Sequence, residues 1–118
     1  MTIKLALFGR EHTIFIDDEK LKEACENNNI DDPEYTTGLF VADTREIYVS
    51  TAQEPEDVVQ TLLHEVLHAI GHVTGHVQLT HSTRKNEAFI NAIASGILDL
   101  LKSKEVFATI KALLGHDV

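Results

Sequence analysis

The chain has 118 residues, of which 43% are hydrophobic and 25% are charged, as is typical of one globular domain with one core. The net charge of −9, with no basic stripe, argues against a nucleic-acid-binding surface. No apolar run approaches the roughly 18 residues that a membrane span needs. We therefore treat residues 1–118 as one domain that binds neither nucleic acid nor membrane.

The expected location is the cytoplasm. The N-terminus shows no charged region, apolar stretch and cleavage site in the order that a signal peptide requires. The one cysteine, Cys25, leaves no internal disulfide and fits a reducing compartment. Because Cys25 shares the apolar side of a predicted helix with Leu21, we expect a buried, unreactive thiol.

The first half of the chain predicts two strand pairs and a short helix. Residues 17–29 open with three acidic side chains and place Leu21, Ala24 and Cys25 on one side, as an amphipathic helix does. β-rich runs lie on either side of this helix. They form one hairpin from residues 3–8 and 12–16, and a second strand pair from residues 39–42 and 46–50.

The second half of the chain predicts helices. One begins at Pro55 and ends near residues 72–75, where Gly71 and Gly75 weaken it. Residues 84–103 are apolar nearly all round, which predicts a helix buried in the centre of the protein. A last amphipathic helix covers residues 106–114. The expected class is α+β, a small mostly antiparallel sheet with helices packed on it.

The most informative motif is His64-Glu65-Val66-Leu67-His68, an H-E-x-x-H pattern inside a predicted helix. Residues four apart lie on one side of a helix, so the two imidazoles can bind one metal ion. Glu65 then lies beside that ion, where it can take a proton from a water molecule as a general base. The pattern predicts a Zn²⁺ site with His64 and His68 as ligands and Glu65 as the catalytic residue.

A catalytic zinc ion usually has a third protein ligand, and Glu87 is the preferred candidate. It lies in the first turn of the second long helix, where a buried carboxylate needs compensation by a cation. His72 would lie about 12 Å from His64 along an unbroken helix, which argues against it. His76 and His81 remain alternatives.

Further residues are candidates for support of this site. Asn91 lies one turn after Glu87, and its amide oxygen is a candidate acceptor for the second ring proton of a ligating histidine. A second donor to a developing oxyanion is also expected. His76, His81 and Tyr48 are the candidates for that role.

The motif followed by Glu87 on a second helix resembles the gluzincin pattern of thermolysin-type zinc peptidases, although Asn91 stands where that pattern has a carboxylate. Residues 38–101, with "TLLHEVLHAIGH" and "NEAFINAIASGIL", are also similar to small bacterial and phage-encoded zincin-like peptidase domains of the ImmA/IrrE and SprT-like groups. The resemblance implies a minimal zincin-like fold. It also implies a Zn²⁺-dependent hydrolase that cleaves a peptide or protein substrate.

The substrate was expected to add as a strand to the edge of residues 46–50, in a shallow groove or one completed by a partner chain. Two other functions remain open. One is a non-catalytic zinc-binding regulatory or protein-interaction module. The other is a metal-free helical core with histidines present by chance, which predicts His64 and His68 pointing to solvent.

Overall fold

The computed structural model describes residues 1–80 and 83–115, and it is an α+β structure with a four-stranded mixed sheet. The strand order is β1-β2-β4-β3. Neighbours β1 and β2 are antiparallel, as are β3 and β4, whereas β2 and β4 are parallel. The strands are β1 (Thr2–Leu7), β2 (Arg10–Ile16), β3 (Gly38–Val41) and β4 (Glu46–Val49).

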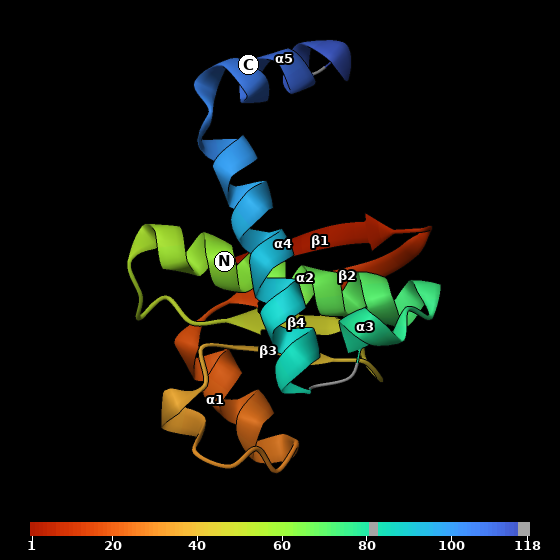
Figure 1. Cartoon of the computed structure of the whole chain (residues 1–118). Coiled ribbons are helices and arrows are strands. Elements are labelled where there is room, and N and C mark those ends of the chain that lie inside the picture. Colours follow the sequence, from red (N-terminus) through yellow and green to blue (C-terminus); the bar gives the residue numbers. More distant parts are fainter. Residues whose placement is uncertain (81–82, 116–118) are drawn as a thin grey trace.

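The described part of the chain contains five α-helices, which lie on both sides of the sheet (Figure 1). Three of them are long enough to matter for the site: the sheet-covering helix α2 and the pair α4 and α5 that follows it. The helices are α1 (Asp18–Asn27), α2 (Pro55–Thr74), α3 (Val77–Thr80), α4 (Arg84–Lys102) and α5 (Lys104–Leu113), with a 3₁₀ turn, η1, at Pro33–Tyr35. None of these helices is both long and apolar enough to cross a lipid bilayer.

Helix α2 covers one side of the sheet and forms the main core with it. Its Ala69 packs with Ile14 of β2 and with Ile47 and Val49 of β4, all of them buried. Strand residues alternate between the two sides, so Phe15 points to the opposite side. There, Lys20 of α1 lies over the Phe15 ring, 5.2 Å from its centre. The sheet is therefore enclosed between α2 and α1.

The ends of α2 follow from its sequence. Pro55 occupies the first turn, where its missing N–H costs nothing. Gly75 ends the helix in the left-handed conformation, with φ of 76°, and its N–H donates to the carbonyl of Gly71 at 2.8 Å. The predicted stop near residues 72–75 is confirmed.

The expectation that the second long helix is buried all round is wrong. Only Ile90 and Ala94 of α4 are buried, and they pack with Leu67 of α2 in a second small core. Phe89 is 49% exposed. The apolar residues of α4 outnumber the neighbours that can cover them, because α2 and α3 contact one side of the helix and nothing described covers the other.

This one-sided packing gives a stability prediction for two adjacent residues of α4. Ile90 is fully buried, so Ile90→Ala should lower the free energy of unfolding by about 2–5 kcal/mol. Phe89→Ala removes more atoms from a half-exposed position and should cost less than about 1 kcal/mol. Urea unfolding followed by circular dichroism measures both. Equal losses would mean that α4 is enclosed on both sides.

Candidate metal centre

Helix α2 brings His64, Glu65 and His68 together. One ligand atom from each of the three side chains lies within 4.8 Å of the others. The two imidazole centres are 4.9 Å apart, as expected for residues one turn apart on one side of a helix. Neither ring points away into solvent, which contradicts the metal-free reading of the motif: the side chains are 18% and 11% exposed.

Each imidazole uses its Nδ1 atom in a hydrogen bond to an oxygen that only accepts. His64 Nδ1–H donates to Asn91 Oδ1 at 2.7 Å, and His68 Nδ1–H donates to the carbonyl of Leu79, also at 2.7 Å. In a neutral imidazole the other nitrogen then carries a lone pair. Both Nε2 atoms are therefore oriented as metal ligands are, with the outer nitrogen fixed by an acceptor. The role predicted for Asn91 as acceptor for His64 is confirmed.

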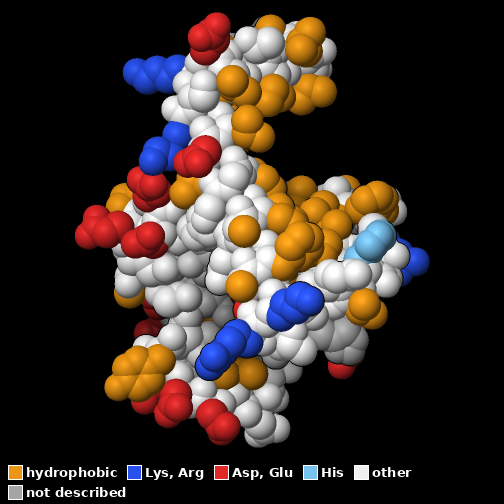
Figure 2. Space-filling view, in the orientation of Figure 1, with side chains coloured by type: hydrophobic (Ala, Val, Ile, Leu, Met, Phe, Trp, Pro, Cys, Tyr) orange, Lys and Arg blue, Asp and Glu red, His pale blue; other side chains and the backbone are white. Residues whose placement is uncertain are grey.

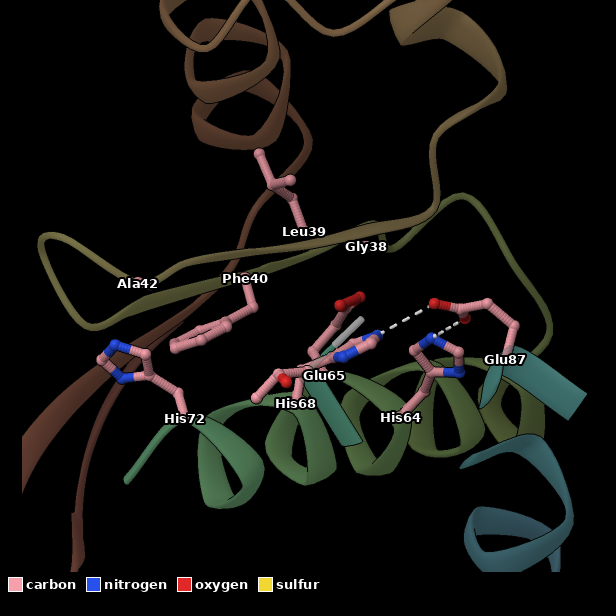
Figure 3. Close-up of a pocket in the computed structure, with 10 residues that line it drawn as sticks. Gly38, Leu39, Phe40, Ala42, His64, Glu65, His68, His72 and Glu87 are labelled. Atoms are coloured by element: carbon pink, nitrogen blue, oxygen red, sulfur yellow. Dashed lines mark ion pairs between the residues drawn. The ribbon is translucent and has the colours of Figure 1, made fainter. Parts of the chain in front are cut away.

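Glu87 faces both Nε2 atoms from the first turn of α4 (Figure 3). Its Oε2 is 2.8 Å from His64 Nε2, and its Oε1 is 3.3 Å from His68 Nε2. Two nitrogen lone pairs and a carboxylate repel one another unless a proton or a cation lies among them. Ligands of a tetrahedral zinc ion lie about 3.3 Å apart when the metal–ligand bonds are about 2.0–2.1 Å. The donor set and its spacing fit Zn²⁺.

Glu65 is buried beside this cluster, with 7% of its surface exposed. Burial, and then the negative charge of Glu87, raises the pKa of Glu65 to about 8. The first residue of β3, Gly38, lies directly over it. A Cβ atom on Gly38 would stand 3.0 Å from Glu65 Cγ and 2.6 Å from Thr61 Cγ2. Glycine is therefore required for β3 to approach α2 at the site.

A groove follows β3 on both sides of Glu65. A larger hollow of about 460 Å³ and a smaller one of about 230 Å³ share Gly38, His64 and Glu65 in their linings. The larger hollow extends past Phe40 to His72, whereas the smaller one is lined by polar side chains such as Gln60. The candidate metal centre thus lies in the middle of one groove between β3 and α2.

His72 lies in this groove but not against the candidate cation position. Its ring contacts the edge of Phe40, with ring centres 5.8 Å apart. Figure 3 shows His72 at the end of the groove far from Glu87. His76 lies outside the groove, beside Leu79 and Phe89, and donates from Nδ1 to the Thr74 hydroxyl at 2.8 Å. His81 lies outside the described residues.

The structure excludes Tyr48 as a second donor to an oxyanion. Tyr48 stacks on Phe15, with ring centres 5.1 Å apart, on the side of the sheet that faces α1. Burial raises the pKa of Tyr48 to about 12, and the nearby carboxylates of Glu46 and Glu23 contribute. The prediction for Tyr48 was wrong, because strand alternation places Ile47 and Val49, and not Tyr48, on the side of α2.

Sequence reasoning missed the contribution of Gly71, Leu79 and Phe40. Gly71 lies inside α2, where glycine is unfavourable, and this was the available signal. A Cβ atom there would collide with the Leu79 side chain and lie 3.0 Å from its carbonyl carbon. The absence of a side chain at Gly71 lets α3 approach closely enough for the Leu79 carbonyl to reach His68.

A comparison with known proteins finds no match to this chain among family models, curated proteins or solved structures.

The close approach at Gly71 gives a prediction for metal affinity. Gly71→Ala should displace Leu79, remove the acceptor from His68 Nδ1 and lower the Zn²⁺ affinity by about 10–100-fold. Gly96→Ala, in α4, meets open space and should leave the affinity unchanged. Competition with a chromophoric chelator measures both. Equal affinities for the two variants would show that the Leu79 carbonyl does not orient His68.

Proposed function

We propose that this chain is a zinc-dependent peptidase in which His64, His68 and Glu87 bind Zn²⁺ and Glu65 is the general base. The observation that supports it most is the approach of the Glu87 carboxylate to both Nε2 atoms, 2.8 and 3.3 Å away. Two histidines and one glutamate are a known ligand set of catalytic zinc, which leaves a fourth position for water. The resemblance to zincin-like peptidases rests on the motif and its spacing.

The chemistry divides between the metal and the chain. A bound Zn²⁺ ion lowers the pKa of water and polarises a carbonyl group. Glu65 lies one residue after His64, so its carboxylate accepts the proton from the attacking water and passes it to the leaving nitrogen. Burial beneath Gly38 keeps this carboxylate away from bulk solvent. Asn91 and the Leu79 carbonyl hold the two imidazoles in orientation.

The groove supports a peptide or protein substrate. Strand β3 is at the end of the described sheet, so its outer edge offers backbone N–H and C=O groups to an added strand. The expectation that the substrate adds to residues 46–50 was wrong, because β4 is paired on both sides, with β2 and with β3. A peptide along β3 would pass over Gly38 and place a backbone carbonyl near the three proposed ligands.

Zinc binding is the first test. Purified wild-type protein should bind one Zn²⁺ per chain, measured by atomic emission after dialysis. Glu87→Ala should lower the affinity by more than about 100-fold, because loss of a direct ligand costs more than loss of an outer acceptor. Glu65→Gln should retain one ion. Wild-type affinity in Glu87→Ala would remove Glu87 from the site, and no binding by the wild type would refute the proposal.

Peptide hydrolysis is the second test, made with the zinc-loaded protein on a mixed-peptide digest followed by mass spectrometry. Glu65→Gln should reduce the rate of cleavage by about 10²–10⁴-fold, since general-base catalysis contributes this much. Because this variant keeps its zinc, the loss would locate the defect in proton transfer. A zinc-loaded wild type without cleavage at any peptide would favour the non-catalytic zinc-binding module.

A further inference from the structure

The part of the molecule farthest from the groove carries an apolar surface that nothing described covers. Helix α5 projects beyond the rest of the chain at the end of α4 (Figure 1), and hydrophobic side chains gather over it (Figure 2). Leu113 is 81% exposed and Leu114 is 68% exposed. We call this surface the arm patch. Its residues are Leu100, Leu101, Val106, Phe107, Ile110, Leu113 and Leu114.

Helix α5 has too little support within one chain. Its substantial contacts are with α4 alone, and none of its residues is buried. A helix of 10 residues is shorter than the roughly 12–15 that an isolated helix needs for stability in water. Its apolar residues nevertheless recur at helical spacing and form a continuous stripe, the pattern of a helix that packs against a partner. The stripe therefore requires a covering surface that one copy of the chain does not supply.

We propose that the arm patch joins two copies of this chain about a two-fold axis, with α5 of each copy against α5 and the end of α4 of the other. The area fits a second copy. Seven large apolar side chains expose on the order of 600 Å² in one chain, more than the surface of a soluble monomer usually presents in one patch. Two such patches bury roughly 1,200 Å² in total, which reaches the range of specific interfaces.

The charge distribution also favours a second copy at this place. Residues 1–57 carry a net charge of −9, so two copies that met through that half would repel each other. Residues 99–113 hold three lysines against one aspartate and one glutamate, a net charge of +1. One of the lysines, Lys102, is paired with Glu56 at 2.9 Å. The arm is thus nearly neutral, and two arms approach without a large electrostatic cost.

A dimer of this kind leaves the groove open. Glu87 and Leu100 are 13 residues apart on α4, which corresponds to about 20 Å along the helix. The second copy therefore adds no residue to the metal centre. The dimer can be tested independently of zinc binding and of peptide cleavage.

Size-exclusion chromatography with light scattering on the full chain tests the proposal. With rising concentration, the wild-type mass should move from 13.1 kDa towards twice that value. Phe107→Glu and Leu113→Glu should each raise the dissociation constant by at least about 100-fold, because each places two charges in an apolar contact. Leu113→Met should keep the dimer. Tyr35→Glu, which changes an aromatic residue that is 81% exposed outside the arm, should also keep it.

Hydrogen exchange gives a second measurement on the same proteins. Backbone amides of residues 104–113 should be protected at concentrations where the wild type is a dimer, and should exchange rapidly in Phe107→Glu at every concentration. Unchanged zinc affinity in Phe107→Glu would show that the rest of the chain is folded. A wild type that stays at 13.1 kDa up to about 0.5 mM, or a dimer that Phe107→Glu and Leu113→Glu leave intact, would overturn the proposal.

Discussion

The packing of α4 on α2 is the interaction on which the candidate site depends. Leu67, Ile90 and Ala94 form its apolar centre, one turn away from the polar groups that it brings together. Glu87 and Asn91 lie one turn apart on α4, so both reach α2 when this contact forms. Helix α2 by itself supplies two imidazoles, and α4 supplies the carboxylate and one of the two acceptors that orient them.

The two imidazoles are oriented by chemically different groups. His64 donates to a side-chain amide, whereas His68 donates to a backbone carbonyl. The amide can be replaced by substitution of Asn91 alone. The carbonyl of Leu79 depends on the path of the chain, and that path depends on the lack of a Cβ atom at Gly71. A glycine that would be unfavourable in an ordinary helix is thus explained by a contact with the next element.

Much of the site could be predicted from the sequence because it obeys local helical spacing. His64, Glu65 and His68 lie on one turn, and Asn91 follows Glu87 by one turn, so periodicity placed each group. The Leu79 carbonyl has no residue type that marks it. The side to which Tyr48 points depends on register, and the parallel pairing of β2 with β4 joins strands that are distant in sequence. Composition gave the apolar character of α4, but not how many neighbours it has.

The position of Glu87 and Asn91 on one helix has a consequence for folding. Sliding or lifting of α4 would remove a ligand and an orienting group in the same movement, so the site has no half-assembled form that still holds a metal well. A cation that binds only the assembled site stabilises the folded state in proportion to the logarithm of its concentration. Metal supply would then set how firmly these two helices stay together, and apo protein would lose that docking before it loses the sheet.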